Sequence, residues 1–214
     1  MPVYYQPRKL RDWRAALERG ILILDTETTG LGEDAEIIEI AIIDGFGDVL
    51  LDTLVKPRGK IPAEVSQIHG ITDEVVADAP DWSEVSHDLL IALNGAGRFS
   101  SDLVIWNAPF DLRMIQQTDR LYGLNSAFQD KRLGLDAEGQ AICAQDDYRR
   151  RWGERLPCGR LKRQSLAAAC KQQGIQQDSS RAHRALYDCQ MTLEVIKAMA
   201  AHDRRARHEN GKGK

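Results

Sequence analysis

Short, continuous runs of apolar residues recur along the chain and are typical of β-strands that are buried on both faces. Such runs occur at residues 21–24 and 103–106, and runs with polar interruptions at residues 37–43 and 49–55 also indicate strands. A half-exposed strand would alternate apolar and polar positions, whereas a central strand needs apolar side chains throughout. The glycine-containing residues 44–47 favour a hairpin turn between residues 37–43 and 49–55. The pattern therefore predicts a sheet whose first three strands form a meander.

Helical signals dominate the rest of the chain. Capping residues and apolar spacing predict helices at residues 8–19, 81–93, 164–173 and 184–200. We expect a further helix directly after Asn107 and Pro109, and a fifth strand at residues 141–144. Helices that alternate with strands in this way indicate an α/β domain with a mixed sheet.

The length of 214 residues suits one domain with a sizeable core. We expect an N-terminal helical extension over residues 1–19 and the main domain over residues 20–201. Residues 202–214 are polar and basic, and we expect a disordered tail there.

Composition narrows the class of protein. The chain is 43% hydrophobic and 29% charged, which is typical of a folded globular protein. Its net charge of −3 argues against a protein that coats duplex nucleic acid without sequence preference, since such proteins are usually basic. Any contact with nucleic acid is therefore expected to be local, at a site, a cleft or a strand end.

The cysteines indicate a reduced, intracellular setting. They are far apart in the sequence, at Cys143, Cys158, Cys170 and Cys189. None forms a CxxC pair, which disfavours a zinc site or a redox motif. The first residues do not resemble a signal peptide, and no apolar run approaches the ~20 residues of a membrane span. We expect a cytoplasmic protein without membrane contact.

Acidic residues lie at the end of the first predicted strand. Asp25 and Glu27 are two residues apart, so both side chains can project to one side. Carboxylates in such a place can form an oxygen-rich pocket for a hard divalent cation. Strand ends also carry Asp in turns and caps, so the pair alone is weak evidence for a metal.

Two later positions add candidate groups. Asp111 lies in the first turn of the helix after the fourth strand, where an Asp is also favoured by the helix dipole. Asp188 lies near the start of the last long helix, with the small residues Ala185 and Thr192 on its own face. His183 precedes that helix, where a histidine is often a plain surface residue.

Taken together, three segments resemble the motifs of a known family. LDTETTGL, WNAPFD and HRALYDCQMT follow one another in the order seen in the DEDDh branch of the DnaQ-like exonucleases, which includes the proofreading epsilon subunit of bacterial DNA polymerase III. Residues 68–72, IHGIT, are similar to a segment between the first two motifs, and residues 166–175 to the helix before the last. The resemblance covers roughly residues 20–200.

The resemblance implies a fold, an activity and a metal site. The fold would be ribonuclease H-like, a five-stranded mixed sheet flanked by helices. The activity would be metal-dependent 3′-to-5′ exonuclease action on DNA that releases nucleoside 5′-monophosphates. Two Mg²⁺ ions, or Mn²⁺, would be held by Asp25, Glu27, Asp111 and Asp188, with His183 as the general base. Histidine titrates near neutral pH, which suits that role.

Substrate contacts follow from the same resemblance. The backbone of residues 26–29 would border the terminal nucleotide, with Thr26 and Thr28 as candidate contacts. His69 would lie near the 3′ end, although a structural histidine in a loop is as good an interpretation. Asn107 would position the strand.

A basic stretch lies outside the motifs, over residues 149–163. It has two interpretations: a groove for the phosphate backbone with Trp152 stacked on a base, or a solvated helix face beside Asp146 and Asp147.

Two other functions stay open at this point. One is a 3′-to-5′ exoribonuclease or oligonucleotide-trimming enzyme, because the motifs describe phosphodiester chemistry and not the sugar. The other is a noncatalytic nucleic-acid-binding module on the same fold. The expected partner is nucleic acid, as single-stranded 3′ ends of DNA; the sequence does not indicate a polymerase partner.

Overall fold

The computed structural model describes residues 10–94, 102–125 and 141–211. Its strands are β1 (Ile21–Thr28), β2 (Ile37–Asp44), β3 (Val49–Leu54), β4 (Asp102–Ile105) and β5 (Ile142–Cys143). Its helices are α1 (Trp13–Arg19), α2 (Ala63–His69), α3 (Trp82–Asn94), α4 (Ala108–Leu121), α5 (Ala144–Trp152), α6 (Leu166–Gln172) and α7 (Ala185–Gly211).

The strands form one five-stranded mixed sheet in the order β3-β2-β1-β4-β5. β1 to β3 pair antiparallel as a meander, and β4 and β5 continue the sheet in parallel with β1. The meander turns at residues 44–47, where Asp44 Oδ1 accepts hydrogen bonds from the amides of Phe46, Gly47 and Asp48. The predicted α/β class and mixed sheet are confirmed.

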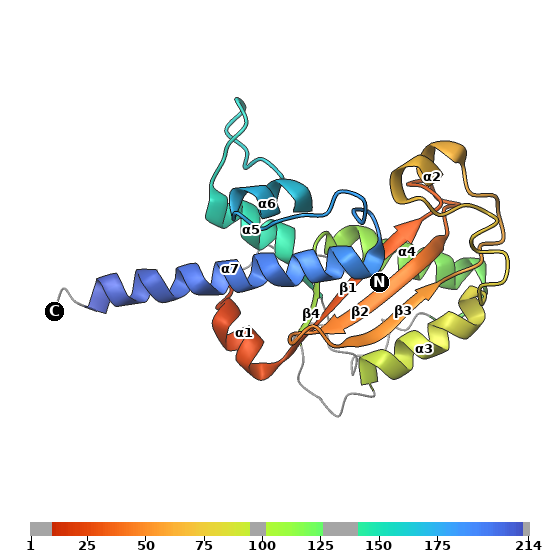
Figure 1. The fold of residues 1–214 in the computed structure, drawn as a ribbon, viewed down its shortest axis with the longest axis horizontal. Helices are drawn as coiled ribbons and strands as arrows, with labels where there is room; N and C mark the ends of the chain where they lie inside the picture. Colours follow the sequence, from red (N-terminus) through yellow and green to blue (C-terminus); the bar gives the residue numbers. More distant parts are fainter. Residues whose placement is uncertain (1–9, 95–101, 126–140, 212–214) are drawn as a thin grey trace.

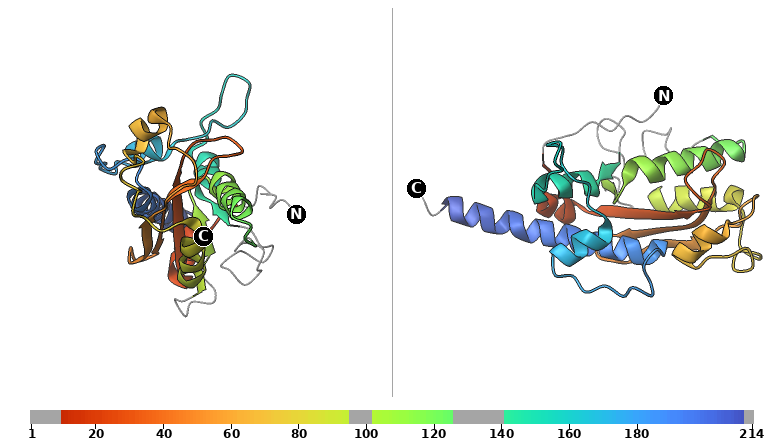
Figure 2. Two further views of the ribbon diagram at one scale, coloured as in Figure 1. Left: turned by 90° about the vertical axis from the view of Figure 1, so that its right-hand side faces the viewer. Right: turned by 90° about the horizontal axis from the view of Figure 1, so that it is seen from above.

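Helices cover both faces of this sheet (Figure 1). Alternate residues of β1 point to opposite layers, so Leu22 and Leu24 pack with α3 and α4, whereas Ile21 and Ile23 pack with α1, α5, α6 and α7. The view from above in Figure 2 shows the sheet between these layers. A strand covered on both sides explains the continuous apolar run in β1.

Several element bounds differ from the prediction. β1 continues to Thr28 because β2 pairs with it over that length, so Asp25 and Glu27 lie within the strand. The first helix begins at Trp13, where Asp12 caps it by accepting from the amide of Ala15; residue 8, the predicted start, lies outside the described residues. Two short helices, α2 and α5, were not predicted as separate elements.

α7 continues to Gly211, past residue 202, where the sequence analysis expected a disordered tail to begin. Residues 202–210 contain no proline or glycine, and Ala, Arg and Glu among them favour a helix. At the other end, α1 is not set apart from the main domain: Trp13 is fully buried in the core that α7 covers. In the described part of the chain, no helix combines the length and apolar character that a membrane span requires.

Candidate active site

β1 places the first two carboxylates on one face of the sheet. Asp25 and Glu27 follow Ile21 and Ile23 at alternate positions, so they point to the layer that contains α7. β4 ends at Ile105, which pairs with Leu24, and the chain then turns into α4 beside the next residues of β1. The carboxyl end of the central strand is thereby left open to side chains from two helices.

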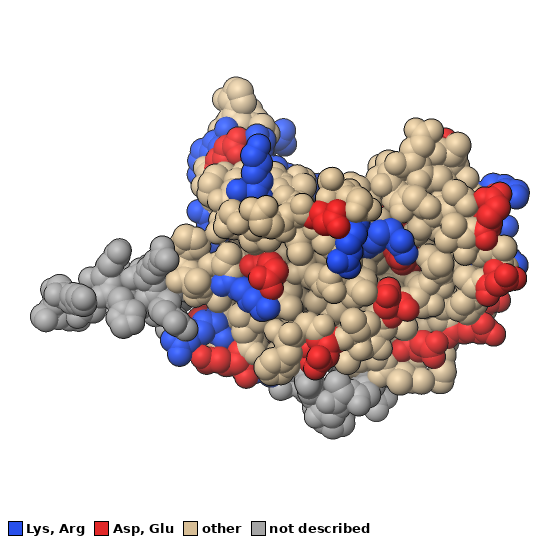
Figure 3. Space-filling view, viewed as in Figure 1, with Lys and Arg blue, Asp and Glu red and all other residues tan. Residues whose placement is uncertain are grey.

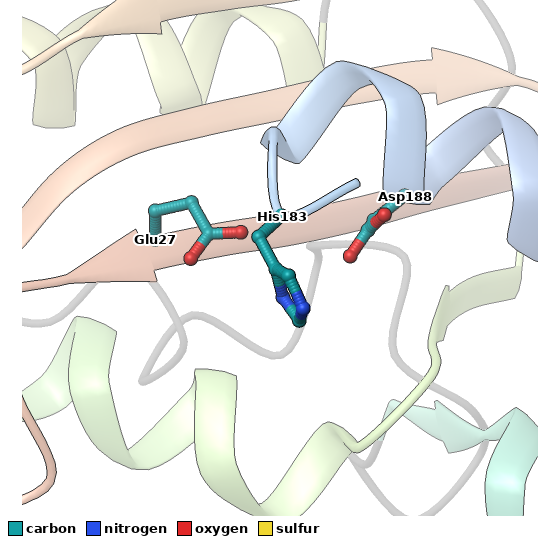
Figure 4. Close-up of side chains that lie close together, drawn as sticks. All are labelled: Glu27, His183 and Asp188. Atoms are coloured by element: carbon teal, nitrogen blue, oxygen red, sulfur yellow. The ribbon is translucent and has the colours of Figure 1, made fainter. Parts of the chain in front are cut away.

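α7 supplies groups from its first turn. Asp188 lies one turn into the helix, after His183 at its entry. Glu27 and Asp188 each offer a carboxylate oxygen and His183 a ring nitrogen, and these three atoms lie within 4.8 Å of one another. Figure 4 shows the imidazole of His183 between the two carboxylates. Residues more than 150 positions apart in the sequence therefore meet at this point.

His183 has an unusual backbone conformation. Its φ of 61° lies in the left-handed region, which is uncommon for residues other than glycine, although asparagine, aspartate and histidine adopt it more often than the rest. Burial raises the pKa of the Asp188 carboxyl, and the nearby His183, whose backbone hydrogen-bonds to that carboxylate, offsets part of the rise. With this backbone conformation the imidazole lies near the carboxylates of Glu27 and Asp188.

Asp111 enters the site from α4. It is 3% exposed, and its Oδ1 accepts a hydrogen bond of 2.8 Å from the hydroxyl of Thr26. Thr26 faces the α4 layer, since it alternates with Asp25 and Glu27 along β1. The Thr26 side chain therefore holds a site carboxylate, and the expected contact of the Thr26 backbone with substrate stays a prediction.

The electrostatics of the four carboxyls favour a bound cation. Burial, and then repulsion from Asp188, raise the pKa of Glu27 to about 8. Burial raises the pKa of Asp111 to about 7 and that of Asp188 to about 6. Burial, followed by the charges of Asp111 and Asp188, raises the pKa of Asp25 well above its ordinary value. Such a cluster stays ionised at neutral pH only if cations balance it.

This donor set fits hard divalent cations. Every carboxylate can offer oxygen, the ligand that Mg²⁺ and Mn²⁺ prefer, and no cysteine sulfur stands among the grouped ligand atoms in the described residues. Asp25, Glu27, Asp111 and Asp188 are the residues that would hold them.

Sequence reasoning missed one charged pair beside the site. Glu39 of β2 is 2% exposed and lies opposite Glu27 in the β1–β2 ladder. Its carboxylate accepts hydrogen bonds from Arg184 Nε (3.0 Å) and Nη2 (2.6 Å), and from the amide of Ala185 (2.8 Å). The signal was present, because Glu39 interrupts an otherwise apolar strand.

The remaining candidate residues have varied surroundings. The hydroxyl of Thr28 donates to the carbonyl of Gly30. His69 ends α2, and its Nδ1 accepts from the amide of Ile71, while Nε2 is buried and makes no hydrogen bond to the described residues. Burial lowers the pKa of His69, which favours the neutral ring.

Asn107 and the basic stretch are linked. The Asn107 Oδ1 accepts a hydrogen bond of 2.8 Å from Arg163, and does not cap α4. In α5, the basic side chains pair with the buried Asp146 and Asp147, as the interpretation of a helix face beside two acids expected. The pairs are Arg149–Asp146, Arg150–Asp146 and Arg151–Asp147.

Comparisons with known proteins agree on one activity. The family model described as exonuclease (RNase_T) matches residues 22–196. An exonuclease of Escherichia phage 186, CP81, is 43% identical over 184 residues, which cover 86% of this chain and 90% of the phage protein. The epsilon subunit of DNA polymerase III from Pasteurella multocida is 30% identical over 188 residues, covering 83% of this chain and 67% of that subunit.

Solved structures show the same fold. Exonuclease X in complex with 5′ overhanging duplex DNA is 29% identical, with a TM-score of 0.54, over 85% of this chain and 92% of that one. The nuclease domain of 3′hExo, a DEDDh family member bound to rAMP, has a TM-score of 0.66 and 18% identity over 86% of this chain and 92% of that one.

Proposed function

Because the chain belongs to the DnaQ-like exonucleases of the DEDDh type, we propose that it removes nucleotides one at a time from the 3′ end of DNA and releases 5′-monophosphates. It is an exonuclease, a hydrolase that acts on nucleic acid, on the ribonuclease H-like fold. The observation that carries the proposal is the convergence of Glu27, His183 and Asp188 from distant motifs within 4.8 Å.

The carboxylates have a binding role in this proposal. Asp25, Glu27, Asp111 and Asp188 would hold two Mg²⁺ or Mn²⁺ ions, whose positive charge would favour the ionised form of carboxyls whose pKa burial raises. When bound, the ions supply charge neutralisation at the phosphate and a lower pKa for a bound water.

His183 accepts the proton of the attacking water. Its ring lies beside Glu27 and Asp188 and is exposed at the surface of the site, where water has access. The left-handed backbone at His183 sets the position from which the ring projects toward the carboxylates. Asp188 helps to hold the turn through the backbone of His183.

The terminal nucleotide lies against the end of β1 in this proposal. The residue 26–29 backbone and Thr28 border the nucleotide. The ring of His69, which lies beside the backbone of Thr28, borders the 3′ end of the nucleotide. Asn107 and its partner Arg163 contact the strand just behind it.

DNA is favoured over RNA by the relatives. The homologous epsilon subunit belongs to a DNA polymerase, and exonuclease X was solved with duplex DNA. The RNA alternative stays testable, since phosphodiester hydrolysis itself does not depend on the sugar.

A gel assay tests the proposal. DNA labelled at its 5′ end, single-stranded or 3′-recessed, is incubated with Mg²⁺, with Mn²⁺ or with EDTA. We expect a ladder that shortens from the 3′ end with either metal and none with EDTA. The site variant is Asp25→Asn with Glu27→Ala, and the matched control is Asp88→Asn on the exposed side of α3.

The outcomes separate the alternatives. RNA of the same sequence degraded faster than DNA would assign the enzyme to RNA trimming. Degradation from the labelled 5′ end would contradict the proposed polarity. Strand binding without cleavage of either nucleic acid would support the noncatalytic module.

A further inference from the structure

Residues 153–163 form a hairpin that projects from the domain. Arg155 and Leu161 form an antiparallel bridge, and the amide of Leu156 donates to the carbonyl of Arg160. The turn is specified by sequence: the Gly159 amide donates to the Leu156 carbonyl (2.8 Å), and Gly159 has a φ of 82°. Figures 1 and 2 show this hairpin standing out beyond α5 and α6.

The hairpin carries a charge opposite to that of the whole chain. It contains four basic residues and one acidic residue, whereas the chain has a net charge of −3. The basic residues are Arg155, Arg160, Lys162 and Arg163, and each is exposed. Figure 3 shows Lys and Arg side chains gathered over this projection.

Most of these cations have no carboxylate partner. Lys162 pairs with Glu154 (2.7 Å), but no described carboxylate forms an ion pair with Arg155, Arg160 or Arg163. Arg155 donates to the carbonyl of Gly159 instead. This contrasts with α5, whose arginines pair with buried aspartates. An exposed guanidinium without a carboxylate is suited to bind an external phosphate, often through two parallel hydrogen bonds.

The base of the hairpin reaches the edge of the active site. Arg163 donates to Asn107, which directly precedes α4, and Asp111 lies in the first turn of that helix. In the proposed function Asn107 contacts the strand just behind the terminal nucleotide, so Arg163 connects the hairpin to that part of the strand. Trp152, which directly precedes the hairpin, is 44% exposed. One face of its ring stacks on Tyr148.

We propose that the hairpin of residues 153–163 binds the phosphate backbone of the DNA strand behind the 3′ end that is being hydrolysed. This inference rests on the proposed function for the identity of the strand. Arg155 and Arg160 contribute the outer contacts, and Arg163 joins them to the site. Neutralising phosphates releases counterions, so these contacts raise affinity in a salt-dependent way and without reading sequence.

Binding is measured first, without hydrolysis. A labelled single strand is titrated in EDTA against the wild type and R155A/R160A, with fluorescence anisotropy as the readout. The control is R14A/K197A, which removes the same charge from exposed positions of α1 and α7. We expect Kd to rise about tenfold for R155A/R160A, and the slope of log Kd against log salt to fall by about 1.4, at ~0.7 per lost contact.

Two further measurements locate the contact. R155K/R160K keeps the charges and should restore most of the salt slope. Cys158 at the hairpin tip is exposed while the other three cysteines are buried, so its alkylation rate reports on the hairpin in the unmodified protein. We expect the bound strand to slow that alkylation.

Kinetics separate this inference from the proposed function. With Mg²⁺, R155A/R160A should raise KM about tenfold for a long strand and leave unchanged the hydrolysis of the p-nitrophenyl ester of thymidine 5′-monophosphate, which is too short to reach the hairpin. A wild type that hydrolyses neither substrate would overturn the proposed function, while the binding data still decide the role of the hairpin. Equal Kd and salt slope in the wild type and R155A/R160A would overturn the hairpin contact.

Discussion

The carboxylate of Glu39 accepts hydrogen bonds from two nitrogens of the Arg184 guanidinium, at 3.0 and 2.6 Å. Arg184 directly follows His183 in the chain. The same carboxylate accepts from the Ala185 amide, so it also satisfies the start of α7. Glu39 thus ties β2 to the turn that carries His183, directly across the ladder from Glu27.

We therefore expect Glu39→Gln to lower kcat by about tenfold with little change in KM. The glutamine keeps one acceptor for Ala185 but loses the charge-assisted pair with Arg184, so the turn at His183 is held less firmly. The measurement is steady-state hydrolysis of DNA with Mg²⁺. Asp52→Asn is the matched control, since the charge of Asp52 also acts on Arg184 but Asp52 is not its hydrogen-bond partner in the Glu39 pair. Equal kcat in Glu39→Gln and the wild type would rule out this positioning role.

The stability of the metal-free protein should fall as pH rises. The pKa of Glu27 is raised from 4.5 to about 8 by burial and neighbouring charges. Between those values the folded state binds more protons than the unfolded state, so the free energy of unfolding decreases with pH. This contribution is fully present below 4.5 and is lost as pH passes through about 8.

Melting temperatures in EDTA from about pH 5 to about pH 9 measure this effect. Glu27→Gln should flatten the decline, because glutamine resembles the protonated acid, whereas Asp88→Asn should not. Adding Mg²⁺ or Mn²⁺ should restore stability, and most strongly at high pH, where the carboxylates are ionised. A melting temperature that neither pH nor metal changes would count against the site.

Thr26→Val should weaken metal binding at neutral pH. Valine keeps the shape but removes the hydroxyl that donates to Asp111, and this hydrogen bond lowers the pKa of Asp111 from where burial alone would place it. Without it the carboxyl is protonated more often near pH 7, so we expect the metal concentration for half-maximal activity to rise several-fold. Raising the pH should remove the difference from the wild type; a difference that persists at high pH would point to a packing defect.

Much of the site was predictable because strand geometry is local. The apolar run before Asp25 indicated a buried strand, and the two-residue spacing to Glu27 placed both carboxylates on one face. The motif order then brought Asp111, His183 and Asp188 into the same expectation.

The rest depended on pairing between distant segments. Nothing near Glu39 indicates that its partner is Arg184, since 145 positions separate them. The hydrogen bond from the Thr26 hydroxyl to Asp111 depends on which face of β1 α4 packs against. The local sequence pattern does not specify that packing. The extension of β1 beyond Leu24 likewise came from its pairing with β2.

His183→Asn should retain strand and metal binding while losing most turnover. Asparagine tolerates the left-handed φ of 61° at this position, so the turn into α7 survives, but its amide cannot accept a proton from water near neutral pH. Removing a general base typically costs about 100- to 10,000-fold in rate, and we expect kcat to fall within that range.

His183→Ala provides the comparison that separates chemistry from backbone strain. Alanine removes the base and also disfavours the left-handed turn, so it should lower both kcat and the melting temperature, whereas His183→Asn should lower kcat alone. Rapid mixing of preformed enzyme–DNA complexes with Mg²⁺ measures the hydrolysis step directly. If His183→Asn cleaved at the wild-type rate while binding DNA equally well, His183 would not be the base, and a water held by the carboxylates would have to lose its proton by another route.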